Sequence, residues 1–173
     1  ITVDKKVGKA ALSENCQASF IDLPGTYSIN PTSIDENIVL QTLLNKEHDD
    51  FPDVIVVVAD IENIKRNLLL YSQIKDLQIP TILAINMADQ LEKKGVQIDL
   101  EQLKTELKSE VVLISARKNL GIDELKKVIE NYRELDTSAL AQISEKIDKE
   151  YFEELKRSFR NLSLYKVWLY ITQ

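Results

Sequence analysis

Val54-Ile-Val-Val-Val-Ala-Asp60 decides the fold, because it is a short run of β-branched apolar residues that ends on a carboxylate. Two similar runs follow it, at residues 81–86 and 111–115. Segments with helical periodicity lie between the three runs. Strands that alternate with helices in this way predict a mostly parallel sheet flanked by helices, which is the α/β class.

Helix signals separate these strands. Ser33-Ile-Asp-Glu36 has the form of a capping box and predicts a helix to about residue 44. Asp99-Leu-Glu-Gln102 predicts a second helix to about residue 108 in the same way. A third helix is predicted at 64–77 by apolar residues at helical spacing: Ile64, Leu68, Tyr71 and Ile74. A fourth helix is expected after Gly121.

The two ends of the chain differ from this pattern. Residues 3–10 and 16–22 are two extended pieces separated by polar Ser13-Glu14-Asn15, and we expect an antiparallel hairpin at the sheet edge. After Tyr132 the sequence is charged, free of Gly and Pro, and helical in its period. We therefore divide the chain into an α/β domain at 1–132 and the start of a helical appendage at 133–173.

Charge and composition exclude several classes of protein. The 173 residues include 28 acidic and 22 basic side chains, so the net charge of -6 disfavours a nucleic-acid partner. The single cysteine, Cys16, cannot form an internal disulfide, and a reducing compartment fits it. The apolar runs are much shorter than the roughly 20 residues that cross a bilayer, so this chain is expected to be soluble.

The first candidate for chemistry is Asp22-Leu-Pro-Gly25, which follows an apolar strand. A carboxylate at the carboxyl end of a strand can hold a metal ion through water, and Gly25 lets a backbone N–H approach a phosphate closely. The alternative is a plain turn, because Pro-Gly is a common turn signal.

Two more candidates follow later strands. In Asn86-Met-Ala-Asp89 the amide suits O6 and N7 of guanine, and the carboxylate accepts from N1–H and the exocyclic amine. The alternative is that both residues only end a strand and cap the next helix. The small pair Ser115-Ala116 lets backbone N–H groups reach a base, or is simply an exit from a strand. All three candidates lie where open α/β sheets bind ligands.

Five stretches carry a resemblance to a known family: Thr2-Val-Asp-Lys-Lys6, Ile21-Asp-Leu-Pro-Gly-Thr-Tyr-Ser28, Asp60-Ile-Glu-Asn-Ile-Lys-Arg-Asn-Leu68, Asn86-Met-Ala-Asp89 and Ile114-Ser-Ala116. They resemble GTPases of the Ras-like superfamily and, more narrowly, the bacterial ferrous iron transport protein B family. The resemblance implies a Ras-like GTPase fold with a C-terminal helical appendage, and GTP or GDP with Mg²⁺ as ligands.

The resemblance also implies residue roles. Thr2 would ligate Mg²⁺ in the triphosphate state, Asp22 would hold the metal through water, and Gly25 would donate its N–H to the terminal phosphate. The residues implied to bind the guanine base are Asn86, Asp89, Ser115 and Ala116. The implied function is a GTP-binding and GTP-hydrolysing regulatory domain whose nucleotide state switches the membrane transport domain of the same parent chain. That parent would carry the domain at the cytoplasmic face of the bacterial inner membrane.

Two departures from the family pattern stand out. The phosphate loop G-x-x-x-x-G-K-[ST] is absent, since no two of the four glycines are five residues apart. In the family this loop precedes the switch threonine, so we expect a missing N-terminal segment that also carries the first strand. Thr26 stands where Ras-like enzymes commonly place a water-orienting glutamine, so intrinsic hydrolysis is expected to be slow.

Two other functions remain open from the sequence. A protein without the phosphate loop could be a non-catalytic binding module that keeps only the fold and its partner surfaces. Another Ras-like GTPase, such as one that assists ribosome assembly, would carry a basic RNA-binding extension, which the charge balance does not supply.

Overall fold

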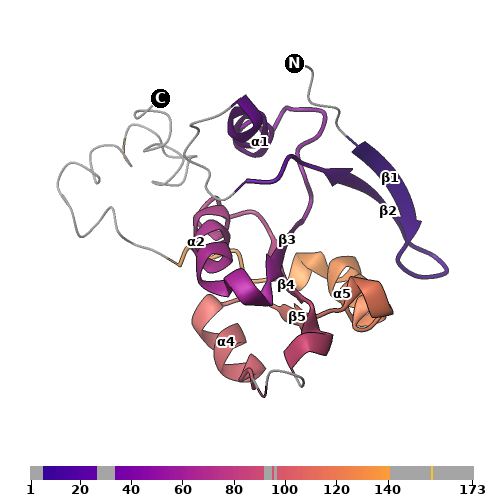
Figure 1. The fold of residues 1–173 in the computed structure, drawn as a ribbon. Helices are drawn as coiled ribbons and strands as arrows, with labels where there is room; N and C mark the ends of the chain where they lie inside the picture. The colour runs from indigo at the N-terminus through magenta and orange to yellow at the C-terminus, as the bar shows by residue number, and fades with distance from the viewer. Residues whose placement is uncertain (1–5, 27–33, 92–94, 96, 141–156, 158–173) are drawn as a thin grey trace.

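The computed structural model describes residues 6–26, 34–91, 95, 97–140 and 157 (Figure 1). Its strands are β1 (Lys6–Ala11), β2 (Gln17–Asp22), β3 (Ile55–Asp60), β4 (Thr81–Asn86) and β5 (Val111–Leu113). Its helices are α1 (Ile34–Leu44), α2 (Ile64–Lys75), α4 (Leu100–Leu107) and α5 (Ile122–Glu130). Thr2 and most of the predicted helical appendage lie outside the described residues, and the described start of that appendage, 135–140, is not helical.

The central sheet is parallel and has the order β3-β4-β5. The three apolar runs therefore form the predicted strands, and the α/β class is confirmed. The last strand ends at Leu113, earlier than expected. Ser115 does not extend it, because its backbone pairs with Leu120 in an isolated bridge. The β3–β4 register pairs Asp60 with Asn86, so the carboxyl ends of these strands meet at one edge.

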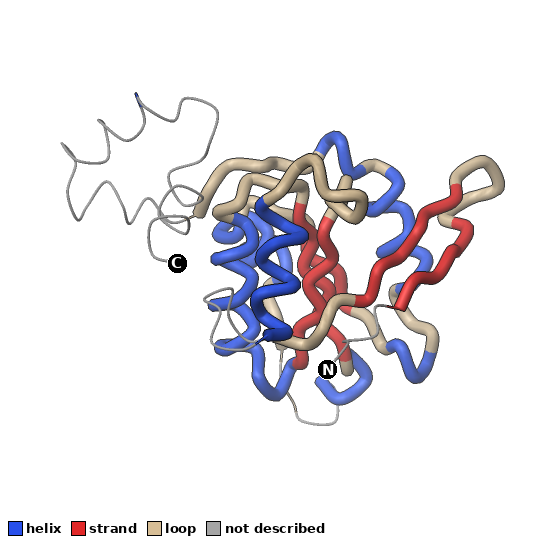
Figure 2. The backbone as a smooth tube through the Cα atoms, turned by 90° about the horizontal axis from the view of Figure 1, so that it is seen from above, coloured by secondary structure: helices blue, strands red, loops and turns tan. Residues whose placement is uncertain are grey.

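Helices cover both faces of this sheet (Figures 1 and 2). α1 and α2 pack on one face in a buried apolar cluster, and α4 adds partly buried leucines to it. α5 packs on the other face with a smaller cluster that includes Ile82, Val112 and Ile129. The predicted apolar side of α2 is confirmed, since Tyr71 and Ile74 are buried. Asp99 caps α4 as expected by accepting from Gln102 N at 2.9 Å.

The hairpin forms as predicted, but its predicted position at the sheet edge is wrong. β1 and β2 pair antiparallel as a separate two-stranded sheet, with Val7 opposite Ile21. The turn of the hairpin contacts α5: Ser13 Oγ donates to Glu130 Oε1 of α5 at 2.7 Å, and Leu12 packs on the α5 cluster. Among the described strands, none outside the hairpin pairs with it, and β1 is exposed along its whole length.

Residues 135–140, here called the connector, follow a 3-10 turn at Tyr132–Glu134 and lie against the end of α2. The Lys75 ammonium donates to the Asp136 carbonyl, and Asp76 Oδ1 accepts from Leu140 N at 2.8 Å. Lys75 and Asp76 are both buried. The connector is therefore fixed to the body of the domain by two polar contacts.

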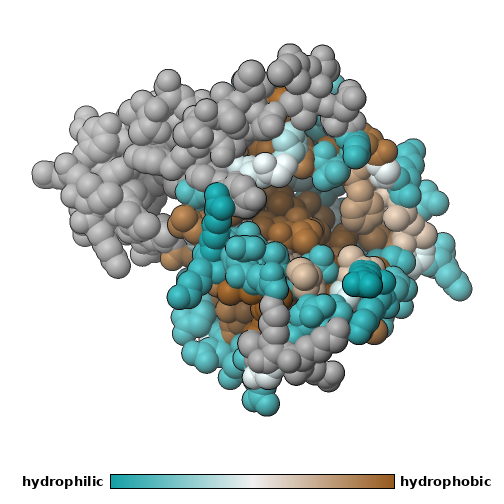
Figure 3. All heavy atoms as spheres, viewed as in Figure 1, coloured by the Kyte–Doolittle hydropathy of each residue, from teal (hydrophilic) through white to brown (hydrophobic). Residues whose placement is uncertain are grey.

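One part of the central sheet stays open. Figure 3 shows an apolar area in the middle of the face that it presents, over the three-stranded sheet. Val58 in β3 is 59% exposed, whereas its neighbour Val57 is buried. Because strand side chains alternate, Val58 points to the same side as Val56, which belongs to the α5 cluster. α5 therefore covers that side of the sheet only in part.

Candidate functional site

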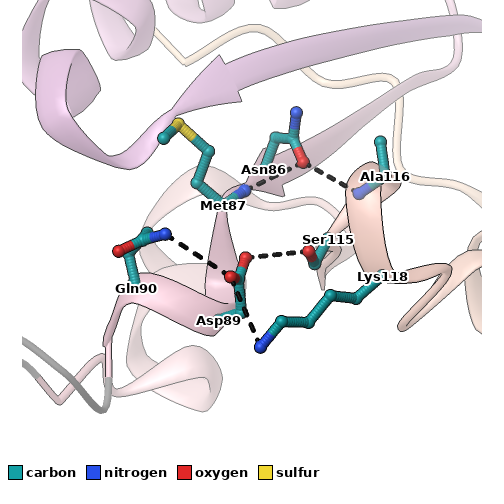
Figure 4. Close-up of polar contacts among 7 residues, drawn as sticks. All are labelled: Asn86, Met87, Asp89, Gln90, Ser115, Ala116 and Lys118. Atoms are coloured by element: carbon teal, nitrogen blue, oxygen red, sulfur yellow. Dashed lines mark hydrogen bonds and ion pairs between the residues drawn. The ribbon is translucent and has the colours of Figure 1, made fainter.

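The candidate site begins where β4 ends, at Asn86. Met87 adopts a left-handed conformation with φ 65°, which turns the chain sharply after the strand. Asn86 Oδ1 accepts from Met87 N at 2.8 Å and from Ala116 N at 3.1 Å (Figure 4). One side-chain oxygen therefore ties the loop after β4 to the loop after β5.

A second pair of contacts joins the same two loops. Asp89 lies in a 3-10 turn at Ala88–Gln90, and its Oδ1 accepts from Ser115 Oγ at 2.8 Å. The backbone follows the same pattern, since Ala88 N donates to Ile114 O at 3.0 Å. The structure thus brings together four of the seven residues expected from the sequence: Asn86, Asp89, Ser115 and Ala116.

The loop after β5 is closed on itself. Ser115 N donates to Leu120 O at 3.0 Å, and Leu120 N donates to Ser115 O at 3.1 Å. Asn119 and Gly121 take left-handed conformations at φ 54° and 71° that make this closure possible. The 3-10 turn at Ala116–Lys118 between these points is consequently held at both ends.

The Asp89 carboxylate is the electrostatic centre of the site. Only 8% of its side chain is exposed, and its Oδ2 lies 3.5 Å from Lys118 Nζ and 3.4 Å from Gln90 Nε2 (Figure 4). The hydrogen bond from Ser115, helped by the Lys118 charge, holds the pKa of Asp89 below its ordinary value against the opposing effect of burial. Asp89 is therefore an ionised acceptor at neutral pH.

The arrangement suits one pattern of ligand groups. The side-chain amide NH2 of Asn86 makes no hydrogen bond within the described residues, so it is available to donate to a ligand acceptor. The carboxylate beside it can only accept while it is ionised. A planar ring that offers acceptors along one edge and N–H donors along the next matches this pair, and adenine does not.

Asp22 and Gly25 are placed differently. Asp22 is the last residue of β2, and both residues are exposed on the segment that follows the hairpin. No hydrogen bond joins either of them to the four residues above within the described part of the chain. A β-carbon at Gly25 would meet no atom within 4 Å, so the backbone there is open to a ligand.

A resident metal ion would need additional ligands at Asp22. No group of three or more His, Cys, Asp or Glu side chains that could hold a metal occurs among the described residues. Mg²⁺ in nucleotide sites is commonly held by one or two protein oxygens together with phosphates and water. The exposed Asp22 carboxylate fits that kind of ligand set, in which the nucleotide brings most of the ligands.

Sequence reasoning missed two residues of the site, Lys118 and Gln90. Both contact the Asp89 carboxylate through side chains that lie on short 3-10 turns. Gln90 is adjacent to Asp89 in the sequence, which is a usable signal for a contact. Lys118 has no such signal, because its approach depends on the closed loop between Ser115 and Leu120.

The three-stranded parallel sheet flanked by helices, with a polar pair beyond its carboxyl edge, has the Ras-like GTPase fold. The sequence profile described as "Ferrous iron transport protein B" matches residues 1–129. This chain belongs to that family.

Relatives and solved structures agree with the assignment. The Fe(2+) transporter FeoB of Leptospira biflexa is 38% identical over 136 residues, which are 77% of this chain and 19% of that protein. The FeoB of Escherichia coli K12 is 34% identical over 77% of this chain and 17% of its own length. The chain thus spans about a fifth of the curated relatives' length.

Two solved structures illustrate the fold. The cytosolic domain of the T. maritima FeoB iron transporter in its GMPPNP form matches 96% of this chain and 66% of its own, with TM-score 0.84 and 29% identity. The FeoB G-domain from Methanococcus jannaschii matches 75% of this chain and 80% of its own, with TM-score 0.68 and 35% identity. Within the described residues, no helix is long and apolar enough to cross a membrane.

Proposed function

We propose that this chain is the GTP-binding and GTP-hydrolysing regulatory domain of a membrane transporter for ferrous iron. The observation that carries the proposal is the hydrogen-bonded pair of loops that presents the Asn86 amide and the Asp89 carboxylate side by side. Family membership and the relatives in GDP and GMPPNP forms support it.

Guanine would be recognised at the three-stranded sheet. The side-chain amide NH2 of Asn86 would donate to O6 and N7 of guanine, while the Asp89 carboxylate would accept from N1–H and the exocyclic amine of the same base. Ser115 and Ala116 would support the base indirectly, since Ser115 donates to the Asp89 carboxylate and Ala116 N donates to the Asn86 side chain. This network orients both groups before the nucleotide arrives, which lowers the entropy cost of binding.

The phosphates would lie toward the segment after β2. Gly25 would donate its backbone N–H to the terminal phosphate, and Asp22 would hold Mg²⁺ through water. Thr2 would ligate the same ion when GTP is bound. The metal would neutralise phosphate charge and so assist hydrolysis.

Hydrolysis would be slow and would not depend on the Thr26 side chain. A threonine is too short to orient an attacking water as a glutamine does. Single-turnover hydrolysis of GTP should therefore proceed at the same rate in the natural chain and in a Thr26→Ala variant. A fast turnover that drops in the variant would contradict this part of the proposal.

We also propose that GTP acts as a switch for the transporter. The terminal phosphate and Mg²⁺ would order Thr2 and Gly25, and hydrolysis would release them. The α/β domain would end near residue 132, and residues 133–173 would begin a helical domain that leads toward the transport portion of the parent. That parent would hold the domain at the cytoplasmic face of the bacterial inner membrane.

Calorimetric titration with GDP and Mg²⁺ tests the nucleotide site, with ADP as the control ligand. We expect saturable binding of GDP alone. Asp89→Ala should abolish this binding, whereas Asp123→Ala should not, because Asp123 is an exposed carboxylate on α5 outside the site. Failure of the natural chain to bind GDP would overturn the proposed function.

Hydrogen exchange tests the switch. Amides of residues 22–26 should exchange more slowly with GMPPNP and Mg²⁺ than with GDP and Mg²⁺, because only the triphosphate analogue offers a terminal phosphate to Gly25. Amides of β4 serve as the internal control, since they are buried under both conditions. Equal exchange of residues 22–26 in both states would rule out the switch.

A further inference from the structure

The Asp89 carboxylate is already occupied in the structure. Lys118 Nζ lies 3.5 Å from Oδ2, while the Ser115 hydroxyl donates to Oδ1 (Figure 4). Because only 8% of the Asp89 side chain is exposed, a ring that approaches this carboxylate must first displace something. The question is which of the donors around Asp89 can leave its carboxylate most easily.

Lys118 can leave the Asp89 carboxylate at a lower cost than Ser115 can. Its side chain is 51% exposed, so its ammonium can leave the Asp89 carboxylate and be hydrated by water instead. Its backbone does not need to move, because the Ser115–Leu120 bridge closes the loop that carries it. Ser115 is 1% exposed and can stay in place, since each carboxylate oxygen accepts more than one hydrogen bond.

We propose that Lys118 is a removable counter-charge that covers the base-binding carboxylate until guanine displaces it. This inference rests on the proposed function and adds a residue that tunes affinity at the same site. The ammonium competes with N1–H and the exocyclic amine for the same oxygen. Lys118 thereby weakens nucleotide binding. The free energy needed to break its ion pair with Asp89 is the same for every ligand that binds this carboxylate.

The test compares Lys118→Met with Lys126→Met. Both variants remove one positive charge, but Lys126 lies on α5 and pairs with the exposed Asp123. Lys126→Met therefore controls for any change in the general attraction of phosphates. Because the Lys118 side chain is half exposed, its ion pair is weak, and we expect Lys118→Met to bind GDP about two- to five-fold more tightly than Lys126→Met at low salt.

Salt and ligand controls sharpen this comparison. High salt should narrow the difference between the two variants, because it screens the ion pair that Lys118→Met removes. ADP should remain unbound by both. Equal or weaker GDP binding by Lys118→Met would overturn the inference, because it would make Lys118 neutral toward the nucleotide or a direct ligand.

A second readout needs no nucleotide. Carboxyl carbon NMR should show a higher pKa for Asp89 in Lys118→Met than in the natural chain, and no change in Lys126→Met. An unchanged Asp89 pKa in Lys118→Met would also overturn the inference. If the natural chain and both variants bind no GDP, the proposed function itself has failed. If the natural chain binds GDP and only the predicted order of affinities is wrong, the inference alone has failed.

Discussion

Gly121 fixes the start of α5 directly behind the candidate site. Its φ of 71° is strained for any other residue, and an added β-carbon would clash with the carbonyl oxygen of Leu113. The backbone after β5 therefore passes close enough to the strand for Ser115 and Leu120 to pair. A residue without a side chain is required to close the loop that carries Ala116 and Lys118.

Substitution of Gly121 should be costly for this reason. We expect Gly121→Ala to lower the free energy of unfolding by about 2–4 kcal/mol, because strain and a backbone clash act together. Gly95→Ala is the matched control, since Gly95 also has a positive φ but open space around it, and it should cost only about 1 kcal/mol. Urea unfolding of both variants measures the difference, and equal losses would exclude the clash.

The hydrogen bond from Ser115 to Asp89 makes a prediction about pH. The folded pKa of Asp89 is lowered, chiefly by this bond, so the bond stabilises the protein above the unfolded pKa of about 3.9. That contribution is lost as the pH falls through the lower folded pKa. Ser115→Ala should therefore be less stable than the natural chain at neutral pH, and the gap should shrink in strong acid. A gap that stays constant across urea titrations at both pH values would contradict the assignment.

At the scale of elements, α2 joins the site edge to the connector. The helix follows Asp60, which pairs in register with Asn86, and it ends at the buried pair Lys75 and Asp76. Burial lowers the pKa of Lys75, while the Asp136 charge acts in the opposite direction. The connector therefore docks on a part of α2 where polar partners are required.

Removal of the Asp76 carboxylate should release the connector locally. A hydrogen bond to a charged acceptor contributes about 1.5–3 kcal/mol, so Asp76→Ala should speed amide exchange at Leu140 by roughly ten-fold or more. Asp76→Asn keeps an oxygen acceptor and should restore most of the protection. Exchange in β4 should stay unchanged, and faster exchange there would mean global destabilisation instead.

The elements differ in how well the sequence predicted them. β3 and β4 were predicted at nearly their observed bounds, because a buried parallel strand is a continuous β-branched run. The α2 face and the Asp99 cap were also predicted from local patterns. The separate position of the hairpin and the burial of Lys75 were not predictable, because both depend on contacts between residues that are distant in the sequence.

The candidate site divides in the same way. Asn86, Asp89, Ser115 and Ala116 were grouped correctly, since the ends of adjacent parallel strands meet at one edge. The contact of Lys118 with Asp89 depends on the loop that the bridge between Ser115 and Leu120 closes. Gly121 permits this closure, but the spacing of residues in the sequence does not show that Lys118 will then reach Asp89.

At the scale of the whole molecule, the two faces of β3 differ in coverage. Val57 lies in the cluster under α1 and α2, whereas Val58 is exposed on the other face. Val57→Thr should cost about 1–3 kcal/mol, because it places a hydroxyl in an apolar core. Val58→Thr should change stability by no more than about 0.5 kcal/mol. Equal losses in urea unfolding would mean that the Val58 face is covered in solution.

The strand order β3-β4-β5 repeats the order of the chain, so each strand pairs with the next one to be synthesised. Each of these parallel pairings closes over a helix and costs loop-closure entropy, but it needs no part of the chain beyond the next strand. Within the described residues, the hairpin forms a separate sheet and contributes no strand to this one. We therefore expect the half of the site that holds Asn86 and Asp89 to assemble during synthesis as soon as the segment after β5 is available, whatever the state of the hairpin.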